Sequence, residues 1–154
     1  MAVVNTSTFK LSAVYPIGGN SVEGFAVPTG SSAGYLSTEG GAAGELIKMD
    51  LATGAKVAVA AMPASGYLLA SPDGATLYLY GNDQLYAIDV ATLKVKNSAP
   101  PVCRSLAATP DGEYLYCSTA SGVDIFATST LEVIGSIPSP AVDSFPGAPI
   151  VITK

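Results

Sequence analysis

The sequence predicts an all-β fold built from repeated units of four antiparallel strands. Three observations predict it: similar segments recur at an offset of 38 residues, apolar and polar residues alternate in short runs, and turn residues separate those runs. No window shows a convincing helical period, and 154 residues suffice for one domain with a sizeable core. We therefore expect a single domain made of stacked β-sheets.

The repeat is clearest in the second half of the chain. Residues 68–74 (LLASPDG) recur as residues 106–112 (LAATPDG) at an offset of 38. The match continues without a gap, so that residues 92–95 (TLKV) fall on residues 130–133 (TLEV). Chance does not produce so many coincidences at one offset, and two adjacent copies of one structural unit are the simplest interpretation.

The first half of the chain carries less regular copies. A third unit opens at Gly24 and has a longer loop at residues 39–44. Residues 5–11 align with residues 89–95 of the second complete unit, which means that the chain starts in the middle of a unit. The N-terminal segment is therefore expected to supply only the third and fourth strands of its unit.

These alignments divide the chain into five consecutive segments. They are a partial unit at 1–16, three complete units at 17–62, 63–100 and 101–138, and a loop with a closing strand at 139–154. In the second complete unit, strands are expected at 67–71, 77–80, 85–89 and 94–98. Four-stranded antiparallel units repeated about every 40 residues are the blades of a β-propeller, so the predicted fold class is a partial β-propeller.

Two kinds of turn punctuate the units. In Pro72–Gly74 and Pro110–Gly112, Pro presets the first φ, Asp bonds the backbone ahead and Gly accepts a positive φ, which predicts tight hairpins. Asn5, Asp50 and Asp89 each lie three residues before a Thr, where a short polar side chain can hold the reversal between the third and fourth strands. We interpret all of these residues as structural.

The second unit resembles the YVTN-type β-propeller repeat, through the run SPDGATLY at 71–78 followed by LYAIDVAT at 85–92. The third unit is similar, although Ala127 stands where an Asp usually ends the third strand, and the first unit has Pro28-Thr29-Gly30 in place of Pro-Asp-Gly. The resemblance covers most of the chain. It implies a propeller used as a binding platform or surface protein more often than as an enzyme, and it assigns no site residue.

The strand count requires something to close the ring. The chain supplies two strands, three complete blades and one final strand at 148–153, and open strand edges invite further pairing. A four-blade monomer, a symmetric dimer with eight blades in which each chain lends its last strand to its partner, and a piece of a longer protein all remain possible. We favour completion by self-association through β-strand addition.

The two cysteines pose a separate question. If Thr109 pairs with Tyr114 across the hairpin turn, Cys117 faces Leu106, and Cys103 lies about three residues, or ~10 Å, further along the strand. A disulfide would not reach across that distance. A register shift would bring the two cysteines opposite each other, and otherwise we expect two small buried or edge thiols.

Composition excludes several classes of function. The chain has no histidine, which removes His-dependent nucleophile activation and most imidazole metal sites. Its net charge of −5, with scattered basic residues, provides no footprint for nucleic-acid phosphates. No secretion signal, membrane-spanning segment or calcium-loop motif is visible in the sequence. We therefore expect no catalytic residue, metal ligand or cofactor, and no membrane insertion, while the compartment stays unknown.

Three aromatic residues are the candidates for binding a partner. Phe145 lies in the long loop at 138–146, where an exposed aromatic side chain could anchor a partner, and Tyr35 and Tyr86 are less constrained by the repeat than the other tyrosines. Tyrosines at second-strand positions are expected to pack between blades instead. They are Tyr78, Tyr80, Tyr114 and Tyr116.

Our main hypothesis is a non-catalytic structural or interaction module, a propeller platform that acts in a homo-oligomer or larger protein assembly, such as a cell-surface or virion particle. One alternative is a lectin-like propeller that binds glycans between blades, although no equivalent set of aromatic and polar residues recurs in each unit. Another is a propeller subunit of a larger enzyme complex. Neither alternative has a motif of its own in the sequence.

Overall fold

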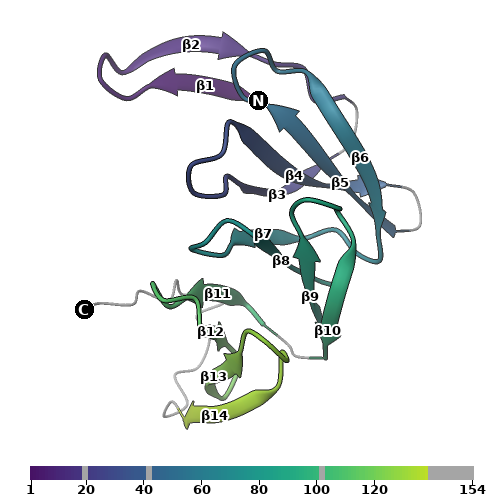
Figure 1. Ribbon diagram of the computed structural model, residues 1–154, viewed down its shortest axis with the longest axis vertical. Coiled ribbons are helices and arrows are strands. Elements are labelled where there is room, and N and C mark those ends of the chain that lie inside the picture. Colours follow the sequence, from purple (N-terminus) through teal and green to yellow (C-terminus); the bar gives the residue numbers. More distant parts are fainter. Residues whose placement is uncertain (19–20, 41–42, 101–102, 139–154) are drawn as a thin grey trace.

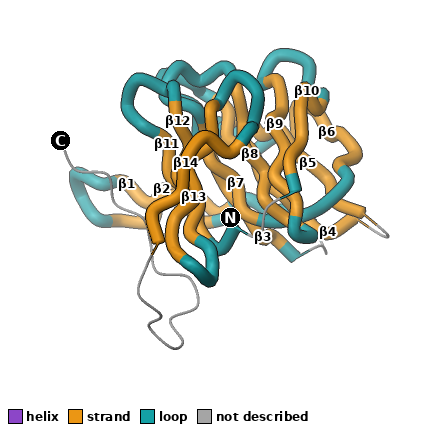
Figure 2. Tube along the Cα trace, turned by 90° about the horizontal axis from the view of Figure 1, so that it is seen from below, coloured by secondary structure: helices purple, strands orange, loops and turns teal. Residues whose placement is uncertain are grey.

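The computed structural model describes residues 1–18, 21–40, 43–100 and 103–138. Within these ranges the chain forms fourteen β-strands and no helix, which confirms the all-β prediction. Figure 2 accordingly shows only strands and the loops that join them. The predicted closing strand at 148–153 and the loop before it lie outside the described residues.

The strands form four antiparallel sheets in chain order. A two-stranded half-blade contains β1 (Ala2–Asn5) and β2 (Lys10–Val14). Blade one contains β3 (Val22–Ala26), β4 (Ala33–Gly40), β5 (Ala43–Asp50) and β6 (Lys56–Met62). Blade two contains β7 (Tyr67–Ala70), β8 (Thr76–Gly81), β9 (Gln84–Asp89) and β10 (Val95–Ala99). Blade three contains β11 (Ser105–Ala108), β12 (Tyr114–Ser118), β13 (Gly122–Ala127) and β14 (Val133–Pro138).

The sheets are stacked as the blades of a partial β-propeller. Figure 1 shows them in succession from the half-blade at the top to blade three at the bottom. The first strand of each complete blade lies on one side of the stack, and β3 packs directly against β7 of the next blade. Each blade therefore has a leading face, turned toward the preceding blade, and a trailing face, turned toward the following one.

The pairing register repeats with the sequence. In blade two Leu68 lies opposite Leu79, and in blade three Leu106 lies opposite Cys117, which are the same two positions shifted by 38 residues. Because side chains alternate between the faces of a strand, an equal register puts equivalent residues on equivalent faces. Residues related by the offset can therefore be compared blade by blade.

The Pro-Asp-Gly turns form as predicted. Gly74 and Gly112 have φ of 72° and 75°, a left-handed conformation that glycine adopts without a Cβ penalty. The carboxylate of Asp73 accepts a bond from the Ala75 amide at 3.0 Å, and that of Asp111 accepts one from the Glu113 amide at 3.0 Å. These hairpins are closed by local chemistry that the sequence already displays.

The turns between third and fourth strands share one geometry. Asp50 and Asp89 each accept bonds from a backbone amide and from the hydroxyl of the Thr three residues on, all at 2.8 Å. Asn5 accepts from the amides of residues 7 and 8. The residue four places after the start of each turn has a positive φ, and these residues are Phe9, Gly54, Leu93 and Leu131. Phe9, Leu93 and Leu131 carry side chains at this position, and the shared conformation aims them in the same direction.

Two apolar cores lie between the complete blades. Leu77, Leu79 and Ile88 on the leading face of blade two pack with Leu46 and other residues of blade one. The trailing face of blade two packs on the leading face of blade three through a second core, which contains Tyr78, Leu85, Leu115, Phe126 and Leu131. Burial of this apolar area holds neighbouring blades together.

The inner strands of blades one and two approach so closely that only glycine fits. A Cβ atom on Gly24 of β3 would lie 2.3 Å from the Gly66 carbonyl oxygen and 2.7 Å from the Leu68 amide nitrogen. Both neighbours are backbone atoms, which cannot swing aside as a flexible side chain would. Gly24 therefore sets the spacing between these two blades.

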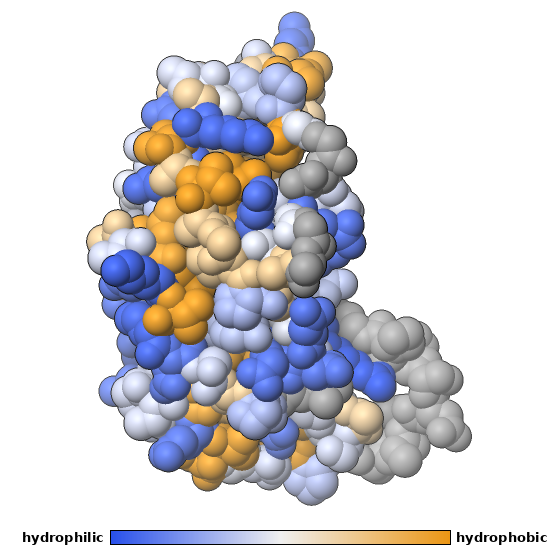
Figure 3. Space-filling model, turned by 90° about the vertical axis from the view of Figure 1, so that its right-hand side faces the viewer, coloured by the Kyte–Doolittle hydropathy of each residue, from blue (hydrophilic) through white to orange (hydrophobic). Residues whose placement is uncertain are grey.

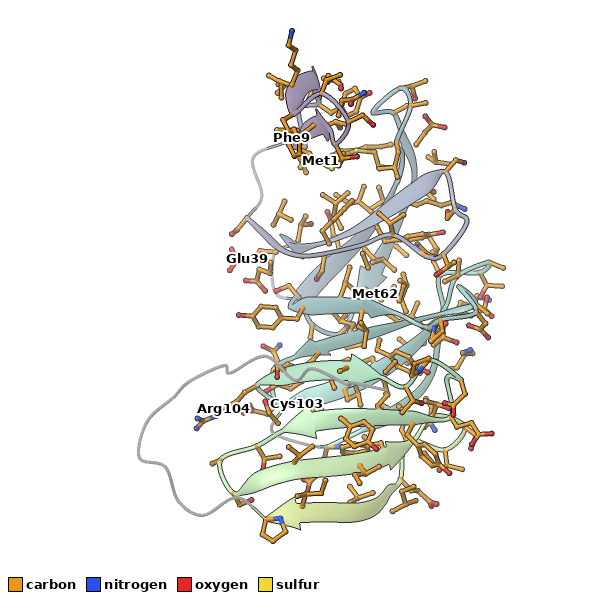
Figure 4. The ribbon with its side chains drawn as sticks, turned by 90° about the vertical axis from the view of Figure 1, so that its left-hand side faces the viewer. Met1, Phe9, Glu39, Met62, Cys103 and Arg104 are labelled. Carbon is orange, nitrogen blue, oxygen red and sulfur yellow. A yellow bond between two sulfur atoms is a disulfide. The ribbon has the colours of Figure 1, made fainter. Side chains whose placement is uncertain are left out.

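The prediction that a disulfide could not reach is wrong, because Cys103 and Cys117 are bonded with their Cα atoms 5.3 Å apart. The predicted register is correct, with Leu106 opposite Cys117. The error lies in extending the strand straight back to Cys103, because β11 begins at Ser105 and the chain bends at Arg104. Figure 4 shows Cys103 at the beginning of blade three.

Candidate functional site

The half-blade exposes an apolar leading face. Ala2 and Val4 of β1 point away from blade one, whereas Val3 between them is half-buried. On this outward side Val4, Phe9, Leu11 and Val14 are all exposed, and Phe9 is 85% exposed. Figure 4 shows Phe9 at the upper end of the molecule, beside Met1. Four large exposed hydrophobic residues on one small hairpin are more than scattered surface residues.

The repeat shows what these side chains normally do. Phe9 occupies the position of Leu131, which is 2% exposed because it packs on blade two. Val4 occupies the position of Ile88, which is fully buried against blade one. Phe9 and Val4 therefore belong to the set of residues that docks each blade on its predecessor, and no preceding blade covers them among the described residues.

An apolar groove runs beside the free edge of β1. Its volume is about 440 Å³, and it is lined by Met1, Ala2, Val3, Phe25, Val27 and Leu51. Strand β1 pairs with β2 on one side, and no described strand pairs with its other side. The groove thus combines an unpaired strand edge with an apolar floor, the combination that accepts an added β-strand.

The half-blade is firmly attached to blade one. The Tyr15 hydroxyl donates to the Ala52 carbonyl of blade one at 2.8 Å. Within the half-blade, the terminal ammonium of Met1 donates to the Tyr15 carbonyl at 2.7 Å. Met1, Tyr15 and Ile17 pack on a buried cluster formed by Leu36, Ile47 and Met49 of blade one. These contacts present the exposed face and the groove on a fixed support.

The trailing face of blade three forms the other end of the stack. Tyr35, Tyr78 and Tyr116 occupy equivalent positions in the three blades, because they pair with Lys48, Ala87 and Ile125 respectively. The following blade buries Tyr35 and Tyr78, whereas Tyr116 is only half-buried. On this same face Ile134 and Ile137 are exposed. Figure 3 shows hydrophobic surface near the top and the bottom of the view, with a larger hydrophobic area between them.

A polar cleft of about 390 Å³ lies between blades two and three. Within blade two, Lys96 donates to the Thr76 hydroxyl at 2.8 Å, and within blade three, Thr128 donates to the Gly112 carbonyl at 2.7 Å. The Asn97 amide of blade two donates to the Thr130 carbonyl of blade three across the junction. The Asp73 carboxylate accepts from the Ser71 hydroxyl and the Ala75 amide, and these bonds lower its pKa. Because these polar groups bond one another, the cleft serves first as an inter-blade junction.

Burial raises the pKa of Tyr78, which lies in the wall of this cleft, and the negative charge of Asp73 raises it further. Its hydroxyl therefore stays protonated at neutral pH and acts as a neutral hydrogen-bonding group.

The structure buries two of the three predicted partner-binding residues. Tyr35 is 1% exposed, in the core between blades one and two, where the Lys48 ammonium lies 5.8 Å from its ring centroid. Tyr86 is 9% exposed and belongs to the same core. Burial argues against both as first contacts for a partner. Phe145 lies outside the described residues.

Sequence reasoning missed Phe9, although the signal was present. The alignment of residues 5–11 with 89–95 puts Phe9 at the position of Leu93. Leu93 packs against the core that lies between blades one and two. Packing between blades is confirmed for Tyr78 and Tyr80, whereas Tyr116 lies on the trailing face of blade three.

The described residues offer little for other kinds of site. Among them, no group of three His, Cys, Asp or Glu side chains lies close enough together to hold a metal ion. The same part of the chain holds no helix of the length and apolarity that membrane crossing requires.

Comparison with known proteins identifies the fold. No protein-family model matches the chain, and no curated protein matches it significantly. The Cps50 (Swd1) β-propeller domain of Myceliophteria thermophila matches with a TM-score of 0.66 and 13% identity, over 79% of this chain and 45% of that one. The RRP9 WD40 repeats match with a TM-score of 0.70 and 14% identity, over 82% of this chain and 41% of that one.

Both matches confirm the β-propeller fold. The chain spans less than half the length of either solved propeller. Neither match bears on the YVTN-type repeat, which stays a prediction.

Proposed function

We propose that this chain is a non-catalytic scaffold for protein–protein assembly, and that it makes contact through its end faces. The observation that carries the proposal is the apolar leading face of the half-blade, where Phe9 is 85% exposed although its counterpart Leu131 is 2% exposed. Covering this face with protein removes apolar surface from water, which is the dominant favourable term in most protein–protein association.

The setting that we propose for this scaffold is a cell-surface or virion particle. The Cys103–Cys117 disulfide supports an oxidising environment, because such bonds persist on secreted proteins, cell surfaces and virions and are rare where thiols are kept reduced. Only 12% of the residues are charged, which suits a chain with much of its surface covered in an assembly.

A photo-crosslinking amino acid at position 9 tests the scaffold proposal. We expect crosslinked protein adducts from native extract, identified by mass spectrometry, whether the captured protein is another copy of the chain or a different protein. The control carries the same group at Val57, which is also apolar and is 59% exposed but lies on β6 of blade one. Equal yields of adduct at the two positions, or none at either, would count against the proposal.

Glycan binding is the second candidate, and the polar cleft between blades two and three is the observation that favours it. Its volume of about 390 Å³ and its Asp, Asn, Lys and Tyr side chains suit a small polyhydroxylated ligand. Calorimetric titration with a panel of monosaccharides tests this candidate. Binding that Lys96→Ala and Asn97→Ala weaken would support it, and heat signals indistinguishable from buffer dilution would remove it.

A further inference from the structure

We propose that the leading face of the half-blade docks on the trailing face of blade three from a second copy of this chain, so that two copies complete one ring. The inference rests on the proposed scaffold function and names its partner. In a two-fold ring each chain offers both faces, and the same junction forms twice. The described residues of each chain form three complete blades and one half-blade, so a ring of two such arcs has eight positions.

The first argument is that the two faces are the two halves of a junction which the chain already makes internally. Blade three docks on blade two through Leu115, Phe126 and Leu131. The half-blade carries Phe9 at the position of Leu131. Blade two receives these side chains on Tyr78 and Ala87, whose equivalents on blade three are Tyr116 and Ile125. The two end faces thus resemble, in residue type and position, the two faces that pack together between blades two and three.

The second argument is that the trailing face of blade three, which no described blade covers, is more apolar than the equivalent face of blade two. Blade two presents Lys96 and Asn97 to the cleft at its covered junction, and the equivalent residues of blade three are Ile134 and Gly135. A face that stayed in water would be expected to carry more polar residues than a covered one, and here the order is reversed. This reversal is what an intermolecular junction requires.

The third argument is complementarity of size. At the internal junction the Asn97 amide donates to the Thr130 carbonyl at 2.5 Å, beside Leu131. The corresponding residues across the proposed junction are Gly135 on one chain and Thr8 with Phe9 on the other. Phe9 is larger than its counterpart Leu131, and Gly135 is smaller than its counterpart Asn97. The larger side chain of one copy would therefore fill the space that the smaller residue leaves on the other.

The fourth argument is the span of the arc. The aligned part of this chain covers 45% and 41% of two solved propeller chains, so two copies would supply most of the length of either one. A two-fold axis closes such an arrangement without leaving an unmatched end.

Size-exclusion chromatography with light scattering on the full 154-residue chain, at 100 μM, is the primary test. We expect a mass near twice 15.5 kDa. Phe9→Asp should weaken the dimer at least about 30-fold, the effect of losing a strong interface residue, and Ile137→Asp should do the same from the other face. Both side chains are exposed within one chain, so the variants should stay folded by circular dichroism, and Val57→Asp is the matched control.

Cysteine crosslinking locates the junction. A Thr8→Cys, Gly135→Cys double variant treated with a short bismaleimide should give a covalent dimer, whereas either single variant should not. Gly135 accepts a side chain, because its Cβ would lie 3.7 Å from Ile125 in ordinary contact.

A monomeric wild type at this concentration, or a dimer that tolerates Phe9→Asp, would overturn the proposal. Either result leaves the scaffold function standing if position 9 crosslinks to a different protein, so the two failures are distinguishable.

Discussion

The Cys103–Cys117 disulfide should make a large contribution to the stability of blade three. The bond closes a loop of 14 residues, and the loss of chain entropy in the unfolded state gives about 3 kcal/mol for a loop of this length. Typical domains are stable by only about 5 to 15 kcal/mol, so reduction should be easily measured. Both cysteines are buried, and Cys103→Ala with Cys117→Ala should therefore cost about 1 kcal/mol more than reduction alone through lost packing.

Urea denaturation followed by circular dichroism, at one fixed protein concentration, is the assay. With a slope of about 1.5 to 2 kcal/mol per M for a chain of this size, reductant should lower the midpoint of wild type by about 1.5 to 2 M. Hydrogen exchange should lose protection in β11 and β12 before β3 to β6, since each blade contacts only its neighbours. The double alanine variant should not respond to reductant. Midpoints for oxidised and reduced wild type within about 0.2 M of each other would refute the reasoning.

Three further predictions follow from single features of the blades. Gly24→Val should lower the free energy of unfolding by about 1 to 3 kcal/mol, because its side chain meets backbone atoms of β7, and urea titration measures this loss. Thr38→Val should raise that free energy by about 1 kcal/mol, because the buried Thr38 hydroxyl has no hydrogen-bond partner among the described residues; an unchanged or lower midpoint would contradict it. Hydrogen bonds from Thr53 and Thr92 lower the pKa values of Asp50 and Asp89 in the folded state. The two ionised carboxylates therefore contribute to the free energy of unfolding above the unfolded pKa near 4, and this contribution is lost as the pH falls through the lower folded pKa values. Stability measured from pH 6 to pH 2 should fall less steeply in Asp50→Asn and Asp89→Asn than in wild type.

The local parts of the fold were predictable because their causes are local. The hairpins at Asp73 and Asp111 depend on residues within three positions of each other, and the reversals at Asp50 and Asp89 depend on a Thr three residues away. Such short-range chemistry is visible in the sequence and forms the same way in each copy. The strand pattern followed from it.

The errors arose where a residue's position depends on another blade or on a bend. Cys103 lies beyond the bend at Arg104, whose amide donates to the Ser118 carbonyl at 2.8 Å, and a straight-strand estimate cannot include that bend. Tyr35 is buried because blade two covers it, which the sequence argument recognised for Tyr78 but did not extend to the more divergent blade one. Correct placement required aligning blade one through its strand pairing rather than through its turns.

The repeat offset and the shared register have a consequence for how such a chain can change over time. A duplication or deletion of one 38-residue unit would add or remove an internal blade while leaving Phe9 and Tyr116 at the two ends of the stack. The angular span of the arc would change by one step, but the terminal faces would be inherited intact. The number of blades and the residues of the two end faces can therefore vary independently. Recombination between repeats would change the symmetry of the assembly and leave the contacts at its end faces unchanged.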